Sequence, residues 1–171
     1  DYTTISIQTG GAGDSDNDHG TAVSGIMGAC DENNVGMIGF AADHEIHVFQ
    51  RNSPNYASTA DVYDYANSLL FAGEATTSSW GYTCNPCPAG QSCPCNPGQN
   101  GSVACEYNAS VKAEIDQGTA AGILYCISAG NGCVNMDDAI FGATFDFTTG
   151  SVYVAAVNST GDHDASCFTS W

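Results

Sequence analysis

His19 is the residue whose type and surroundings most clearly suggest chemistry. It follows the carboxylates Asp14, Asp16 and Asp18 and opens a run of small residues, 20–29. An imidazole titrates near neutral pH and can take and return a proton, so it is a candidate general base. The small residues predict a helix that can pack closely, at the strand-to-helix edge where α/β proteins place their chemistry. On these residues alone, His19 is also explained as a capping or solvated side chain.

Three short motifs, in order along the chain, resemble those of subtilisin-like serine proteases (subtilases, peptidase S8). His-Gly-Thr-Ala-Val-Ser-Gly at 19–25 resembles the histidine motif, and Ser-Trp-Gly at 79–81 resembles the substrate-binding segment. Ser-Ala-Gly-Asn-Gly at 128–132 resembles the oxyanion segment. Ala22 departs from the family, which usually has a second histidine there. The resemblance covers most of the chain apart from roughly 83–109.

The resemblance implies a role for each matched residue. His19 would be the general base, and the Asn131 side-chain amide would stabilise the oxyanion. Backbone groups of 79–81 would pair with an extended peptide by strand addition. The implied substrate-binding residues are Ser79, Trp80, Gly81, Ser128, Ala129 and Gly130. Trp80 would either wall a substrate pocket or pack inward, and without His19 upstream Asn131 would be interpreted as a turn residue.

Two groups of the subtilase triad have no match. In the family the aspartate comes roughly 30 residues before the histidine and the serine roughly 150–160 after it. Only 18 residues precede His19, and no Gly-Thr-Ser-Met-like segment occurs. Residues 154–170 resemble the strand and Ala-Ser-Phe-Ser segment that come before the nucleophile region. We therefore expect residues 1–171 to be a partial subtilase domain, incomplete at both ends, that does not hydrolyse peptides in isolation.

The polar turn at 30–39 resembles the subtilase loop that holds a calcium ion. The implied ligands are the Asn33 side chain and carbonyl groups near Asp31, Val35 and Met37. Such an oxygen-only set suits a hard cation. The family site also uses groups further upstream, and a plain surface turn is the alternative.

The charge of the chain limits its partners. Two basic residues against 19 acidic ones give a net charge of -17. Nucleic-acid binding needs Lys and Arg to neutralise phosphates, so nucleic acid is excluded. An anionic membrane would repel the chain, and no apolar stretch is long enough to span a bilayer. We expect a peptide or protein substrate, and association with flanking segments or other extracellular chains.

Cysteine content predicts a secreted protein. Five of the nine cysteines lie between Cys84 and Cys105, which predicts an oxidising compartment and disulfides. The odd count leaves at least one thiol free or paired outside the chain. A zinc knuckle at 84–98 is the alternative, but no histidine accompanies its cysteines. Glycosylation sequons begin at Asn100, Asn108 and Asn158.

Hydrophobic patterns predict the elements that position these motifs. Strands are expected at 2–7, 45–50, up to 78–81, 123–128 and 151–157, and helices from 19 to 29, 59 to 72 and 110 to 121. Val62, Tyr65, Ala66, Leu69 and Leu70 would form the buried face of the second helix, and Gly122 would end the third. His44 and His47 are expected at a strand edge rather than as ligands. Together these predict an α/β fold: a subtilisin-like parallel sheet with helices on both faces and a Cys-rich inserted loop at about 83–109.

Two functions of different class follow. The first is a segment of a secreted subtilisin-like serine endopeptidase that hydrolyses peptide bonds. The second is a catalytically inactive subtilase-like domain that acts as a structural or interaction module in an extracellular assembly. An acidic calcium-binding surface protein without proteolytic ancestry would leave the three ordered motifs unexplained.

Overall fold

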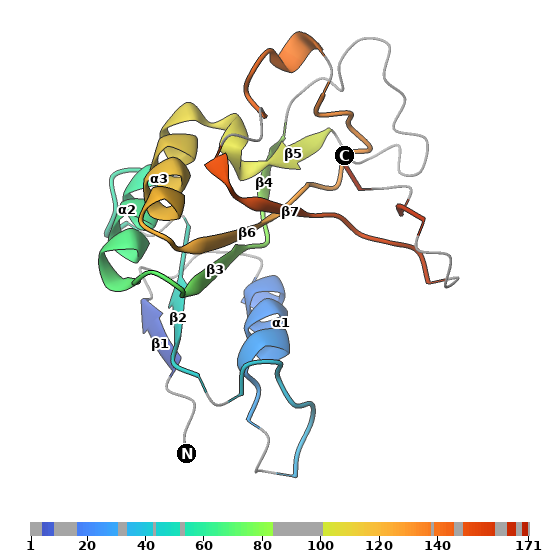
Figure 1. Ribbon diagram of the computed structural model, residues 1–171. Helices are drawn as coiled ribbons and strands as arrows, with labels where there is room; N and C mark the ends of the chain where they lie inside the picture. The colour runs from blue at the N-terminus through green and yellow to red at the C-terminus, as the bar shows by residue number, and fades with distance from the viewer. Residues whose placement is uncertain are drawn as a thin grey trace. The chain divides into compact units, whose positions relative to one another are not determined.

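The fold is described from a computed structural model of the chain (Figure 1). The described residues are 5–8, 17–30, 34–42, 44–51, 54–83, 101–137, 139–145, 149–159, 164–166 and 169–170. They fall into two units, 1–62 and 63–171, and each unit is described by itself. In this part of the chain, no helix is long and apolar enough to cross a membrane.

The first unit contains a parallel strand pair and a helix. β1 (Ile5–Gln8) pairs with β2 (Ile46–Phe49), as the alternating pattern of both segments predicts. α1 (Asn17–Gly28) contains His19 in its first turn. The chain then folds back on the end of α1, where the amide of Gly39 donates to the carbonyl of Ala29 at 2.9 Å. A side chain at position 39 would collide with the backbone there, so the return requires glycine.

The second unit is built around a three-stranded parallel sheet in the order β3-β6-β7. Its strands are β3 (Ala75–Ser78), β6 (Leu124–Ser128) and β7 (Val152–Val154). Ala75 lies opposite Leu124, and Cys126 lies opposite Val152. The continuous apolar run predicted at 123–128 is thus the central strand, the position that is most buried in a parallel sheet. This confirms the prediction of an α/β fold with a parallel sheet.

Two helices cover one face of this sheet, α2 (Thr59–Leu69) and α3 (Ala109–Ala120) (Figure 1). Asn67 of α2 connects this helix to α3 and to β6. Its Nδ2 donates to the Glu114 carbonyl of α3 at 2.9 Å, and its Oδ1 accepts from the Tyr125 hydroxyl of β6. The Asn108 side chain caps α3 by accepting hydrogen bonds from two amides of its first turn. Gly122 follows α3 with φ +91°, which confirms the predicted helix end.

The buried face of α2 differs from the predicted one. Tyr63 is 6% exposed, whereas Tyr65 is 37% exposed. Val62 and Ala66 are buried as predicted, but the buried face extends from them to Tyr63 and not to Tyr65. Both tyrosines lie at helical spacing from Val62 or Ala66, so the tertiary packing of α2 decides between them. The difference is important because the Tyr63 hydroxyl lies beside Ser78, the last residue of β3.

The predicted Cys-rich insertion ends in regular structure rather than in a loop. β4 (Gly81–Thr83) pairs in antiparallel fashion with β5 (Ser102–Ala104), and a 3₁₀ turn, η1 (Cys105–Tyr107), leads into α3. A further turn, η2 (Ala139–Phe141), follows β6. Residues 84–100, with four of the cysteines, lie outside the described residues.

Disulfide bonds in the Cys-rich segment stay a prediction, because four of its five cysteines lie outside the described residues. Cys30, Cys105 and Cys126 are free thiols. Cys105 is fully buried, and burial raises the pKa of its thiol to about 12, so it is protonated and unreactive at neutral pH. Cys105 therefore packs as a small apolar side chain. Cys84, Cys87, Cys93, Cys95 and Cys167 lie outside the described residues.

Candidate functional site

The carboxyl ends of β3, β6 and β7 meet at one edge of the sheet and form a pocket of about 240 Å³. Open α/β sheets bind ligands at this edge. The lining residues are Thr77, Ser78, Ser79, Cys126, Ser128, Val154, Ala155 and Ala156. The fold thus brings Ser79 and Ser128, predicted from separate motifs, to one pocket. Its lining carries no acidic or basic side chain.

The oxyanion motif begins where β6 ends. The Ala129 amide donates to the Val154 carbonyl at 3.1 Å, and the Gly130 amide donates to the Ser128 hydroxyl at 3.2 Å. Gly130 has φ +100°, and a Cβ there would collide with the Ser102 carbonyl oxygen. Backbone conformation and lack of space both require glycine at this position. Asn131 follows directly and is exposed to solvent.

In the segment 79–81, which follows β3, one residue is exposed to solvent and the other two pack or pair within the chain. Ser79 is exposed and lines the pocket. Trp80 is partly buried, with its ring 5.1 Å from that of Tyr82 and 6.3 Å from that of Tyr63, and it is not among the lining residues. Gly81 pairs with Ala104 of β5, so part of the backbone predicted to bind peptide takes part in strand pairing within the chain.

A buried polar cluster beneath the pocket was not predicted. The Tyr63 hydroxyl lies 2.7 Å from the Ser78 hydroxyl and donates to the Cys105 thiol at 3.4 Å. Burial raises the pKa of the Tyr63 hydroxyl above its ordinary value, so the group stays protonated. Ser78 is the last residue of β3, and the cluster therefore holds the strand end from which Ser79 projects. Helical spacing does not separate Tyr63 from Tyr65, because each lies three residues from one of the buried residues Val62 and Ala66.

A buried carboxylate joins η1 to β7. Glu106 is 1% exposed, and it accepts hydrogen bonds from the hydroxyls of Thr149 at 3.3 Å, Ser151 at 2.8 Å and Tyr153. Burial, and then the bond to Glu106, raise the pKa of the Tyr153 hydroxyl. Three hydroxyl donors offset the loss of water around the carboxylate. We interpret Glu106 as a structural residue that anchors the start of β7.

His19 and Asn131 belong to different units. His19 is exposed in α1 of the first unit, and Asn131 follows β6 in the second. Their roles as a pair stay a prediction. His47, on β2, forms an ion pair between its Nε2 and the Glu45 carboxylate at 3.1 Å, which agrees with the predicted strand residue rather than a ligand.

The predicted calcium loop is described only in part. Asp31 and Asn33 lie outside the described residues, while Val35 and Met37 are exposed. Asn34 and Gly36 have φ +54° and +76°, so the described part of this loop is an irregular turn. The described residues contain no group of three His, Cys, Asp or Glu side chains suited to a metal ion. A site made mainly of carbonyls does not need such a group, and calcium stays a prediction.

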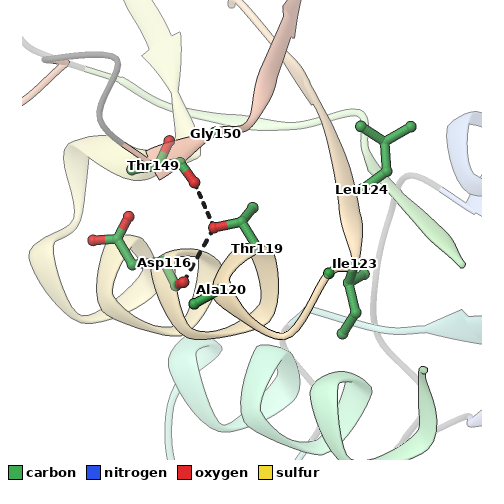
Figure 2. Close-up of a pocket in the computed structure, with 8 residues that line it drawn as sticks. Asp116, Thr119, Ala120, Ile123, Leu124, Thr149 and Gly150 are labelled. Carbon is green, nitrogen blue, oxygen red and sulfur yellow. Dashed lines mark hydrogen bonds between the residues drawn. The ribbon is translucent and has the colours of Figure 1, made fainter. Parts of the chain in front are cut away.

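A second pocket, of about 490 Å³, lies at the opposite edge of the sheet, where β6 and β7 begin (Figure 2). The Thr119 hydroxyl points into it and donates to the carbonyls of Asp116, at 3.1 Å, and Thr149. Asp116 supplies the acidic side chain of this pocket, and no histidine or cysteine lines it. The carboxyl edge is the candidate site, because open α/β sheets bind ligands there and because Ser79 and Ser128, from two separate motifs, line its pocket.

Comparison with known proteins identifies the family of the chain. A family model described as the subtilase family, peptidase S8, matches residues 4–170. The match includes the histidine motif, the pocket residues and the oxyanion motif. No curated protein gave a significant match.

Proposed function

The chain belongs to the subtilase family of peptidases, and from this premise we propose that it is the central segment of a secreted serine endopeptidase. Its substrates would be peptides or proteins, since the family hydrolyses peptide bonds. The acidic charge of -17 agrees with a secreted protein that binds neither nucleic acid nor anionic membrane.

The observation that supports this proposal is the meeting of two motifs at one pocket. Ser79 and Ser128 come from parts of the chain that are far apart in sequence, and both line the pocket at the carboxyl edge. The exposed backbone after β3 can pair with an extended peptide, and the neutral pocket can take one of its side chains. Asn131, three residues after Ser128, follows the same strand.

Each matched residue then has a chemical task. His19 takes the proton of the serine nucleophile and returns it to the leaving amine. The Asn131 amide donates to the oxyanion, and loss of such a donor typically lowers turnover by roughly 10²–10³. The chain contains no match to the serine and the aspartate of the subtilase triad.

A fluorophosphonate probe, which labels activated serine hydroxyls, tests this function in the intact protein that contains the chain. We expect labelling of the wild type, loss of labelling in His19→Ala, and full labelling in His44→Ala, which removes another exposed histidine. Absence of label on correctly folded wild type would contradict the proposal. It would favour the inactive extracellular module instead.

We also propose a structural calcium ion held by Asn33, Asp31, Val35 and Met37. The irregular turn at Asn34 and Gly36, both of which have positive φ, supports it. Because a ligand that binds only the folded state raises its stability, EDTA should lower the melting temperature and added Ca²⁺ should restore it. Equal melting temperatures with and without EDTA would argue against the ion.

A further inference from the structure

We propose that Ser170 is a positioning residue that holds the loop of Asn131, residues 130–134, in the conformation needed to stabilise an oxyanion. The inference rests on the proposed function. Ser170 is 38 residues from Gly132 in sequence, and no catalytic motif pointed to it.

The Ser170 hydroxyl uses its full hydrogen-bonding capacity on this loop and its neighbour. It accepts from the amides of Gly132 and Val134, each at 3.3 Å, and donates to the Ser102 carbonyl at 2.8 Å. A hydroxyl has one proton and two acceptor positions, so all three are occupied. The Ser170 amide adds a fourth bond, to the Gly130 carbonyl at 2.9 Å.

These bonds lie on both sides of Asn131. Gly130 is held on one side, and Gly132 and Val134 are held on the other. Ser170 and Val134 are both fully buried, so water does not compete for the same groups. Asn131 itself remains exposed at the tip of the loop.

Close packing limits movement of the loop further. A Cβ at Gly130 would collide with the Ser102 carbonyl, and a Cβ at Gly132 would collide with the backbone of Gly101 and Ser102. The loop therefore lies directly against β5, and Ser170 joins the two through its bond to Ser102. Without that hydroxyl, the amides of Gly132 and Val134 and the carbonyl of Ser102 each lose this hydrogen bond, and the loop shifts in response.

Such a shift would act on turnover rather than on substrate affinity. An oxyanion donor must lie about 2.7–3.1 Å from the developing charge. A misplacement of about 1 Å can cost roughly 10²-fold in rate. The ground-state peptide is bound mainly through other groups, so KM should change little.

A double-mutant cycle in the intact protein tests the inference. It compares wild type, Ser170→Ala, Asn131→Leu and the double variant, with Ser68→Ala as a control that removes an exposed hydroxyl elsewhere in the second unit. We expect Ser170→Ala to lower kcat by about tenfold or more with KM within about twofold. In the Asn131→Leu background the same change should have no further effect on kcat, and Ser68→Ala should retain wild-type kcat.

The outcomes separate the two proposals. If Asn131→Leu leaves kcat unchanged, the proposed function of Asn131 fails. If Asn131→Leu lowers kcat but Ser170→Ala does not, or if the two effects multiply independently, the role of Ser170 is refuted. Should Ser170→Ala not fold, Ser170→Cys keeps the side-chain volume with a weaker hydrogen-bonding group, and the same comparison applies.

Discussion

Replacement of Tyr63 by phenylalanine should destabilise the protein and loosen the end of β3. The ring of Tyr63 lies 6.2 Å from that of Tyr125 and 6.3 Å from that of Trp80, and phenylalanine keeps both contacts. Only the hydroxyl is lost. The change therefore isolates the hydrogen bonds to Ser78 at 2.7 Å and Cys105 at 3.4 Å.

The expected loss of stability follows from these two bonds. A neutral hydrogen bond contributes about 1 kcal/mol net, and a thiol acceptor contributes less. Ser78 is 6% exposed, so its hydroxyl is left without water and adds a desolvation cost. We expect the free energy of unfolding to fall by about 2 kcal/mol, or the melting temperature by about 4–8 °C for a chain of this size.

Urea unfolding of the intact protein, followed by circular dichroism, measures this loss. Tyr65→Phe is the matched control, because it makes the same chemical change on the same helix at a side chain that is 37% exposed. The control should stay within about 0.5 kcal/mol of wild type.

A cycle with Ser78→Ala completes the test. The two hydroxyls interact directly, so the double variant should lose about 1 kcal/mol less than the sum of the single losses. If Tyr63→Phe is as mild as Tyr65→Phe, or if the two losses simply add, the cluster does not hold the end of β3.

Three further predictions concern other parts of the second unit. Gly130→Ala should cost about 3 kcal/mol or more, since it combines φ +100° with a backbone collision, while Gly142→Ala, at φ +56° in open space, should cost about 1 kcal/mol in the same urea assay. Glu106→Gln should lower stability by about 1–3 kcal/mol at pH 7, because charge-assisted bonds become neutral, and an unchanged urea midpoint would contradict this. Burial raises the pKa of Cys105 and Tyr125 to about 12, so the folded state keeps protons that the unfolded state loses. Stability should then be intact below pH 9 and fall by about 1.4 kcal/mol per pH unit above pH 9, where the unfolded Cys105 thiol loses its proton. It should fall more steeply above pH 10, where unfolded Tyr125 does the same, and a flat urea midpoint from pH 9 to pH 12 would refute this.

Patterns among neighbouring residues in the sequence were sufficient to predict most of the helices and strands. The apolar run at 123–128 is the central strand, and Gly122 ends the third helix, because burial on both faces and helix termination depend on residues next to each other in sequence. Long-range pairing was not predicted. β5 follows a Pro- and Cys-rich stretch, and its pairing with β4 depends on residues about 20 positions away.

The sequence by itself determined the family, the α/β class and the identity of the motif residues, because each motif is a short run of specific residue types. Only the tertiary structure decided that Ser79 and Ser128 share a pocket, that Tyr63 rather than Tyr65 is buried, and that Ser170 bonds to the loop of Asn131. Serine and tyrosine hydroxyls are common throughout the chain, and their own neighbours in sequence do not distinguish them. Which hydroxyl is buried opposite a given amide depends on how distant segments pack, and that is a property of the folded chain.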